Sequence, residues 1–118
     1  MPDNRPSHPA VRKPWWAKKL LDAIQSVAGA SVSHAGRMES DRYFVWEEDD
    51  RDDLTADNRH AETAVTGYLD LYTIYEFDQW VDEIGTAFDD AGILWEMTGT
   101  TWEQNTKFFH HSWEWTVV

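Results

Sequence analysis

The sequence contains no cysteine among its 118 residues, which excludes disulfide bonds and thiolate metal sites. No apolar run approaches the ~20 residues that a membrane-spanning helix requires. Residues 1–14 also lack the hydrophobic stretch that is typical of a signal peptide. From these absences we expect a soluble protein that folds in the cytoplasm.

Motifs that would indicate catalysis are also missing. The sequence has no nucleophile elbow, phosphate-binding loop or dinucleotide fingerprint. The acidic segment 47–57 lacks the central glycine and the correctly spaced glutamate of a calcium-binding hand. His110 and His111 are neighbours on a predicted strand, so they point to opposite faces and cannot bind one ion together. We therefore predict no enzyme, no metal and no cofactor. A calcium site in the acidic segment and a zinc site that draws on His34 and His60 are the minor alternatives.

Positive charge is scarce and unevenly distributed. The chain has 22 Asp and Glu residues but only 10 Lys and Arg residues, which gives a formal charge of −12. Such a surface repels nucleic acid, because non-specific affinity comes mainly from Lys and Arg that neutralise phosphates. Six of the basic residues lie within residues 1–37, together with only two acidic ones. The simplest interpretation is a solvated acidic surface with a basic arm. The alternative is that the basic start docks on an acidic neighbour, including another copy of the chain.

All four prolines lie in residues 1–14, where interior apolar residues are almost absent. We predict a flexible, Pro-rich basic arm over residues 1–14 that becomes ordered only against a partner, followed by a single domain over residues 15–118. Lys18 and Lys19 fall near the start of the first predicted helix, where the helix dipole disfavours them. The predicted partner-docking residues are Arg5, Arg12, Lys13, Trp15, Lys18 and Lys19.

The stretch from Ala64 to Ala91 changes period in its middle. From Val65 to Tyr75, alternate residues are apolar, which predicts a strand with Val65, Leu69, Leu71 and Tyr75 on its core face. From Phe77 to Ala91, apolar residues recur at helical spacing. Asp78 is the predicted cap of this helix, and Gly92 suits the left-handed residue just past its end.

Five further segments complete the expected fold. They are a helix over Trp15–Ala28 that Gly29 ends, a weak strand at Ser31–Arg37, a buried strand at Tyr43–Trp46, a strand at Ile93–Trp102, and an alternating strand from Phe109 to Val117. The last two segments read as a hairpin of aromatic cross-strand pairs. The order α-β-β-β-α-β-β predicts an α+β domain with a mostly antiparallel mixed sheet of about five strands flanked by two helices.

Two surfaces are candidates for contacts with a partner. The first is a long acidic loop after the strand at Tyr43–Trp46, since loops of this length in a small domain are usually functional or disordered. Its acidic residues are Glu47, Glu48, Asp49, Asp50, Asp52, Asp53 and Asp57. The second comprises Tyr68, Tyr72 and Ile74, which lie opposite Leu69 and Leu71 on the predicted strand. A strand that is apolar on both faces needs a second cover, either the first helix or a neighbouring chain.

The sequence contains eight tryptophans, more than a core of this size can bury. Some are therefore expected on a binding or assembly surface. Trp95, Trp102, Trp113 and Trp115 could stack on a sugar. The favoured interpretation is that they pack the sheet against the helices or against another subunit.

Several segments, in this order, resemble the tail-terminator or tail-completion proteins of long-tailed double-stranded-DNA phages, which also occur as minor head–tail joining proteins. The segments are YFVWEED, DDLTADNRHAETAVTGYLDLYT, EFDQWVDEI, GILWEM and HHSWEWTV. The resemblance covers about residues 33–118 and is most specific from Asp53 to Thr73 and from Trp113 to Trp115. The basic arm and the Trp15–Trp16 pair fall outside it.

The resemblance implies a non-enzymatic virion protein with a mixed sheet and two helices. Such proteins form a ring, expected to be hexameric, that ends the tail tube and meets the head connector. The implied partners are further copies, the tail-tube protein and the connector proteins, with assembly in the host cytoplasm. Double-stranded DNA would pass through the bore without specific binding, and an acidic bore would favour that passage. The acidic loop is therefore expected to face the lumen or an adjacent subunit, and the arm to clamp a neighbouring ring. The alternative function is an acidic, Trp-rich binding module for a basic protein partner or a glycan.

Overall fold

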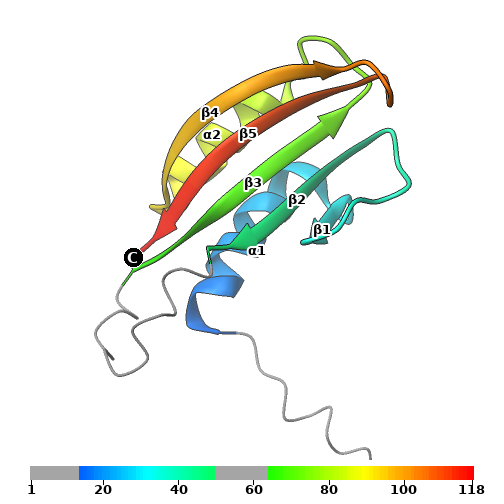
Figure 1. The fold of residues 1–118 in the computed structure, drawn as a ribbon. Coiled ribbons are helices and arrows are strands. Elements are labelled where there is room, and N and C mark those ends of the chain that lie inside the picture. The colour runs from blue at the N-terminus through cyan, green and yellow to red at the C-terminus, as the bar shows by residue number, and fades with distance from the viewer. Residues whose placement is uncertain (1–13, 50–63) are drawn as a thin grey trace, which may run out of the picture.

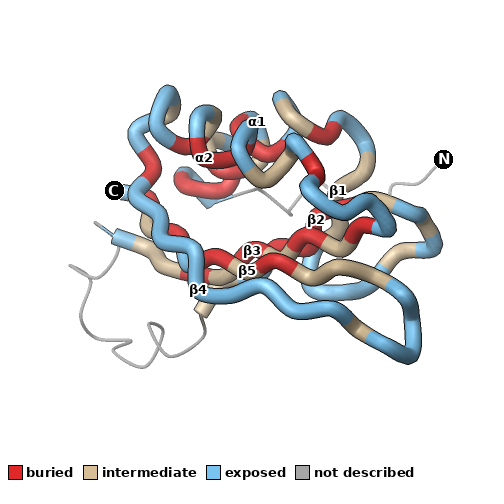
Figure 2. Tube along the Cα trace, turned by 90° about the horizontal axis from the view of Figure 1, so that it is seen from above, coloured by how far each residue is buried: buried red, intermediate tan, exposed pale blue. Residues whose placement is uncertain are grey.

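The computed structural model describes residues 14–49 and 64–118, which form two layers (Figure 1). One layer is a five-stranded sheet, and the other consists of two helices that pack side by side on one face of it (Figure 2). The helices are α1 (Trp15–Ala28) and α2 (Trp80–Ala91). The strands are β1 (Val32–His34), β2 (Arg42–Glu48), β3 (Val65–Thr73), β4 (Leu94–Glu103) and β5 (Phe108–Val117). The predicted α+β class and element order are confirmed.

The strands are arranged in the order β1-β2-β3-β5-β4. β1 runs parallel to β2, and all other neighbours are antiparallel. The predicted aromatic hairpin is present, with Trp95 opposite Trp115 and Met97 opposite Trp113. The two edges of the sheet differ in length, because β1 has 3 residues and β4 has 10.

Alternation along the strands places one set of apolar side chains under the helices. Trp113 and Trp115 are almost fully buried there, and Trp115 lies over Gly67, whose missing side chain makes room for the indole. The other sheet residues of this core are Phe44, Trp46, Leu69, Leu71 and Val117. This face is hereafter the helix face, and the opposite one is the open face.

Helix α1 has the predicted bounds. Its apolar stripe buries Trp16, Leu20 and Ile24, and Gly29, at φ 59°, ends it. The unfavourable charge at its start is partly compensated within the chain, since Lys18 Nζ lies 2.7 Å from Asp22 Oδ2.

Helix α2 begins at Trp80, so the prediction that Phe77 starts its apolar stripe is wrong. Phe77 has φ 60° and is 90% exposed in the turn before the helix. The residue directly before the helix is Gln79, which has helical backbone angles, but the predicted capping contact of Asp78 is present, because its Oδ1 accepts a hydrogen bond from the Trp80 amide at 2.9 Å. That cap requires non-helical backbone just before it, which excludes Phe77 from the stripe. Gly92 ends the helix at φ 73°.

Strand boundaries also differ from the prediction. The weak strand predicted at Ser31–Arg37 covers only Val32–His34, and two other differences change where predicted site residues lie. β3 ends at Thr73, so Tyr75 lies beyond it and is 51% exposed rather than part of the core. β2 continues to Glu48 instead of ending at Trp46. Glu47 and Glu48 therefore belong to a strand and not to the acidic loop, because backbone pairing to β3 as far as Gly67 outweighs the low strand propensity of Glu.

No helix in the two described ranges combines the length and the hydrophobicity that crossing a membrane requires.

Candidate functional site

The most unusual surface of the described chain is its long edge strand. Every residue of β4 except Glu103 is exposed, and no strand in residues 14–49 or 64–118 pairs with its outer edge. Four large apolar side chains are among them. Leu94 is 61% exposed, Trp102 47%, Trp95 38% and Met97 37%. These four residues are called the edge patch.

Figure 2 shows the trace of β4 exposed along almost its whole length, although α2 lies behind the β4–β5 hairpin in Figure 1. Trp95 alone is held by α2. Its indole packs against Gly85, and its Nε1 donates a hydrogen bond to Asp89 Oδ1 at 2.8 Å. At the other end of β4, the rings of Trp102 and Phe109 lie 4.7 Å apart on the same face. The four tryptophans predicted as one stripe are thus divided, with Trp113 and Trp115 in the core and the other two at the exposed edge.

The open face carries a row of carboxylates across the sheet. The strand register aligns Glu47 with Tyr68, Tyr68 with Glu114, and Glu114 with Glu96. Glu96 and Glu114 are direct cross-strand neighbours, a pairing of like charges that costs stability. No ion pair within the described ranges involves any of the three glutamates. Glu47, Glu96 and Glu114 are called the acidic row.

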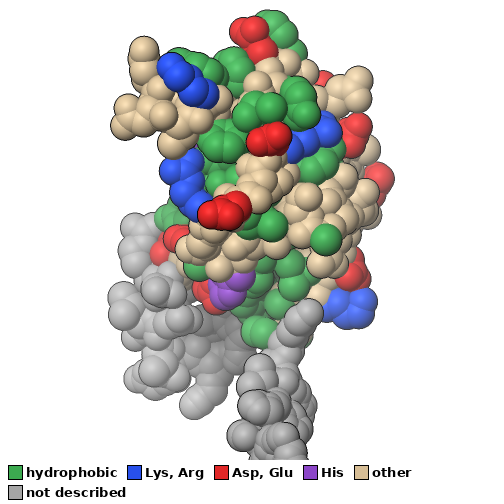
Figure 3. Space-filling view, turned by 90° about the vertical axis from the view of Figure 1, so that its right-hand side faces the viewer, with side chains coloured by type: hydrophobic (Ala, Val, Ile, Leu, Met, Phe, Trp, Pro, Cys, Tyr) green, Lys and Arg blue, Asp and Glu red, His purple; other side chains and the backbone are tan. Residues whose placement is uncertain are grey.

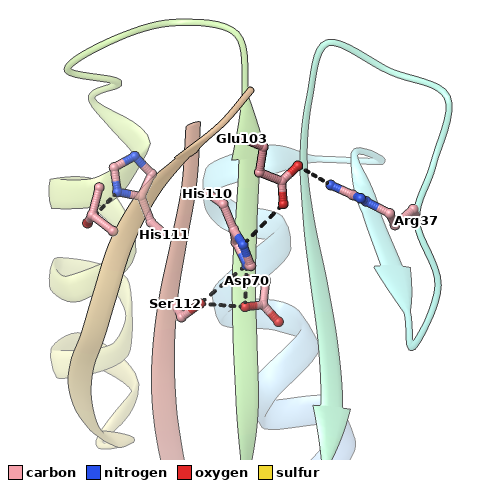
Figure 4. Close-up of polar contacts among 7 residues, drawn as sticks. Arg37, Asp70, Glu103, His110, His111 and Ser112 are labelled. Carbon is pink, nitrogen blue, oxygen red and sulfur yellow. Dashed lines mark hydrogen bonds and ion pairs between the residues drawn. The ribbon is translucent and has the colours of Figure 1, made fainter. Parts of the chain in front are cut away.

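A polar network occupies the opposite end of the same face (Figure 4). Asp70 Oδ1 accepts a hydrogen bond from Ser112 Oγ at 2.7 Å and lies 2.8 Å from His110 Nε2. The other ring nitrogen of His110 is 3.5 Å from Glu103 Oε2. Arg37 Nη2 donates to Glu103 Oε1 at 2.8 Å. The network therefore connects the turn after β1 to β3, β4 and β5.

Two tyrosine rings lie beside this network. Tyr72 stacks on His110 with 4.3 Å between ring centroids, and the Arg37 guanidinium lies 4.1 Å above the Tyr72 ring. Tyr43 stacks on the same tyrosine at 5.3 Å. Burial raises the pKa of Tyr72, and the charge of nearby Asp70 adds to this increase.

The network does not form a nucleophilic triad. In a triad, the carboxylate and the hydroxyl contact different nitrogens of the histidine. Glu103 and Ser112 do lie on different nitrogens of His110, but the Ser112 hydroxyl donates its proton to Asp70 Oδ1 at 2.7 Å and lies farther, at 3.3 Å, from His110 Nε2. Nor does any cluster of His, Asp or Glu in the described ranges have a geometry suited to a metal ion. The arrangement holds side chains in place and presents no activated nucleophile.

A cleft of about 400 Å³ opens on the helix face between α2 and the β4–β5 hairpin. It is called the α2 cleft and is lined by Glu76, Phe77, Asp78, Val81, Asp82, Met97, Thr100, Phe109 and His111. At the end of the molecule where β3 ends and β5 begins, hydrophobic and acidic side chains lie next to one another on the surface (Figure 3).

His111 lies in this cleft and is 91% buried, since its exposed fraction is 9%. Its Nδ1 is 3.0 Å from Thr100 Oγ1, whereas its Nε2 has no hydrogen-bond partner in the described chain. Burial lowers the pKa of His111 below the usual value of 6.5, although the charge of Asp78 acts in the opposite direction.

Asp78 is already fully engaged. Burial tends to raise its pKa, but hydrogen bonds from Arg42, the Trp80 amide and Thr73 outweigh burial, and the pKa is lowered below 3.8. Arg42 Nε donates to Asp78 Oδ2 at 2.8 Å, and Thr73 Oγ1 donates to the same oxygen at 2.7 Å.

The predicted interface residues Tyr68 and Tyr72 lie on the open face. The first helix packs on the other face, so it does not provide the second cover that the sequence left as one option. Tyr72 is half-buried by neighbours from its own chain, and the hydroxyl of Tyr68 donates to Asp49 Oδ2 at 3.2 Å. Ile74 lies beyond the end of β3 and is 41% exposed.

The predicted acidic and basic residues that the structure describes lie in different parts of the domain. Glu47 lies on the open face, and Glu48 Oε1 lies 2.8 Å from His34 Nε2. Trp15 is 51% exposed, and Lys19 is partly buried. The remaining predicted residues lie outside the described ranges, namely Asp50, Asp52, Asp53, Asp57, Arg5, Arg12 and Lys13.

Sequence reasoning missed the polar network and the acidic row. The polar residues alternating with aromatics in the last strand, His110, Ser112 and Glu114, were the available signal. The contacts to Asp70 and Glu96 depend on the strand register, which composition and period do not determine.

Comparison with models of known protein families finds no family that matches the chain, and comparison with curated proteins finds no relative.

Proposed function

We propose that the chain is a structural subunit that assembles with copies of itself into a ring. Its role would be the one that the resemblance implies, ending a phage tail tube and joining it to the head connector. The observation that carries the proposal is the edge patch on β4. Proteins usually protect exposed edges with Lys, Pro or a covering segment. β4 contains neither Lys nor Pro, and its single bulge lies between Met97 and Gly99.

The difference between the two sheet edges favours a ring over a dimer. β1 is short and pairs in parallel, whereas β4 is long and exposes the four apolar side chains of the edge patch. Contact between two unlike surfaces of successive copies is heterologous, and it closes into a ring when the rotation allows. Pairing of β4 with β4 of a second copy would be isologous and would stop at a dimer. The mass of the assembly distinguishes the two arrangements.

The acidic row supports DNA passage through such a ring. Glu47, Glu96 and Glu114 place carboxylates in one line across the open face, with a cost in stability where two of them are direct neighbours. A surface of this kind repels phosphates and so would keep DNA from adhering. We place the open face toward the bore for this reason.

The primary test is the oligomeric state of the full chain. Light scattering after size exclusion, with electron microscopy, is carried out on the protein alone and with purified tail tubes. A closed ring in either sample is the expected result. A strictly monomeric protein at high concentration that also leaves tail tubes uncapped would overturn the proposal.

The assembly surface is tested with Trp102→Lys, which places a charge in the edge patch. Interface aromatics contribute about 2 kcal/mol or more, so we expect the dissociation constant to rise by roughly 30-fold. Thr86→Lys is the matched control, because Thr86 is exposed on α2 and lies with Ser26 and Val27 of α1, not with residues of β4. Circular dichroism establishes that both variants are folded. Equal assembly by both would place the contact elsewhere.

The glycan-binding alternative draws on the same exposed tryptophans, since Trp102 and Phe109 form an aromatic surface at the edge. Tryptophan fluorescence with soluble glycans separates the two functions. Quenching or a blue shift in a protein that stays monomeric would favour the binding module.

A further inference from the structure

We propose that the α2 cleft binds a cationic side chain from the N-terminal arm, residues 1–13, of a second copy of the chain. The inference rests on the proposed self-assembly, but apart from Met97 it uses residues outside the edge patch. The resulting contact would link neighbouring subunits through an arm and a cleft in addition to the edge.

The walls of the cleft combine negative charge with apolar surface. Glu76 and Asp82 line it, and neither forms an ion pair within the described residues. Phe77 and Phe109 add aromatic rings, and Phe77 is 90% exposed. A guanidinium or ammonium group on an aliphatic stem suits such walls, since the charge meets carboxylates and aromatic faces while the stem covers apolar surface.

The buried nitrogen of His111 is an independent indication of a ligand. A buried polar atom without a partner costs about 1–3 kcal/mol. When Nδ1 carries the proton and donates to Thr100 Oγ1, Nε2 of the neutral ring is an acceptor. The head group of Lys or Arg carries only donors and would satisfy this acceptor once the side chains that cover the nitrogen, which has almost no exposed surface, move aside.

An anion is a poor candidate for the same cleft. Three carboxylates line it, from Glu76, Asp78 and Asp82. The first amides of α2 are also occupied, because Trp80 N donates to the Asp78 side chain and Asp82 N donates to Gln79 O at 3.0 Å. The helix start therefore has no free donors at these positions to attract a negative group.

The arm of this chain has matching chemistry. Arg12 and Lys13 are adjacent, and a Pro-rich stretch of six residues, PSHPAV, separates them from Arg5. Nothing in the described ranges supplies a cation to Glu76 or Asp82, whereas the arm supplies three basic residues against one acidic one.

The position of the arm favours a second copy over the same chain. The arm joins α1 beside Trp16, which packs on Trp115 near the start of β3. The cleft lies beside Phe109, which pairs with Thr73 at the other end of β3 (Figure 1). These ends are roughly 30 Å apart along the strand. At about 3.3–3.6 Å per residue, Arg12 and Lys13 lie too close to α1 to reach the chain's own cleft, and Arg5 reaches it only if the nine residues up to Pro14 extend almost straight.

A neighbour seated on the edge patch would already lie beside the cleft, because Met97 belongs to both surfaces. Its arm could then enter from outside without crossing the helix layer. Because the edge patch and the cleft adjoin, the arm that enters the cleft is assigned to a second copy of the chain.

Site-specific photo-cross-linking tests the contact in the full chain. Benzoylphenylalanine replaces Phe77, which is exposed and outside every helix and strand. We expect cross-linked dimers whose mass spectra join position 77 to residues 1–13. Cross-links to the arm within a monomer would overturn the choice of a second copy. Cross-links that never include residues 1–13 would overturn the inference.

Binding of a labelled peptide of residues 1–14 provides the second test. Its target is the full chain with Arg5→Gln, Arg12→Gln and Lys13→Gln, measured by fluorescence anisotropy. Asp82→Asn or Phe77→Ala should weaken binding by about tenfold, the effect of losing ~1.4 kcal/mol. Asp90→Asn, on the exposed face of α2 outside the cleft, is the matched control and should change nothing.

The two proposals fail in distinguishable ways. Rings that persist while the peptide does not bind would refute the arm contact and leave the ring proposal intact. Peptide binding that depends on Asp82 in a protein that forms no ring would support the cleft and refute the ring.

Discussion

The helix face and the open face of the sheet are built from alternate residues of the same strands. Two adjacent histidines show that the faces differ in how many partners they give to a polar side chain. His111, under the helices, has one partner and one orphaned nitrogen. His110, on the open face, contacts two carboxylates and a tyrosine ring. The helix face carries the large cluster of buried apolar side chains, which we expect to provide most of the stability. The open face holds a charged surface that the core does not require.

The largest expected effect comes from filling space on the helix face. A Cβ atom at Gly67 would lie 2.2 Å from Trp115 Cζ2 and 2.3 Å from Glu47 O. Gly67→Ala should therefore destabilise the protein by about 3 kcal/mol, which is at the upper end of the usual cost of overpacking a core. Gly99→Ala is the control, since nothing lies within 4 Å of its added atom. Urea unfolding measures both variants, and equal midpoints would show that the strands at Gly67 can separate without cost.

The second prediction concerns the polar anchor that joins the helix face to α2. Asp78→Ala removes the helix cap and leaves Arg42 and Thr73 without their partner, so we expect a loss of about 3 kcal/mol. The contribution of Asp78 is fully present above pH 3.8 and is lost as the pH falls through its lowered folded-state pKa. The variant should therefore lose less stability than the wild type between pH 4 and strong acid. Asp82 has no such partners, so Asp82→Ala should lower the free energy of unfolding by less than about 0.5 kcal/mol.

The adjacent histidines allow a smaller, pH-dependent comparison. Burial lowers the pKa of His111, so the unfolded chain binds its proton more readily than the folded one. Stability should be constant above the unfolded value of 6.5 and should decrease as the pH falls below it, at most by about 1.4 kcal/mol per pH unit. His111→Gln should reduce this slope, measured by thermal unfolding from pH 7.5 to 5. A slope that instead disappears in His110→Gln would assign the effect to the open face.

Periodic features could be predicted from the sequence, and features that depend on register could not. The α1 bounds, Gly29 and Gly92 follow from apolar spacing and from the φ that a helix end requires. Phe77 was misplaced because its spacing continues the stripe of α2, although the Asp78 cap requires a turn there. Local period alone does not decide between a first helical turn and a cap.

The candidate site also divides into features that sequence patterns predict and features that depend on strand order and register. The excess of tryptophan predicted exposed aromatics, and Trp95 and Trp102 are exposed. Their concentration on an edge strand follows from the strand order, which places the hairpin strand β4 outermost. The polar network joins Arg37 to Glu103, residues 66 positions apart, and no pattern within either segment indicates this contact.

The smallest expected effect concerns Arg37 on the open face. Arg37→Gln removes the ion pair to Glu103 and the cation above Tyr72. The Arg37 side chain is 48% exposed, so solvent screens the pair and the cost should stay below about 1 kcal/mol. Burial tends to raise the pKa of Glu103, but hydrogen bonds from Thr106 and Arg37 outweigh it and hold the pKa below 4.5. In the variant this pKa should rise, as carbon-13 NMR titration of the side-chain carboxyl would detect. A loss comparable to that of Gly67→Ala would show that the open face also carries the fold, and the contrast between the two faces would then fail.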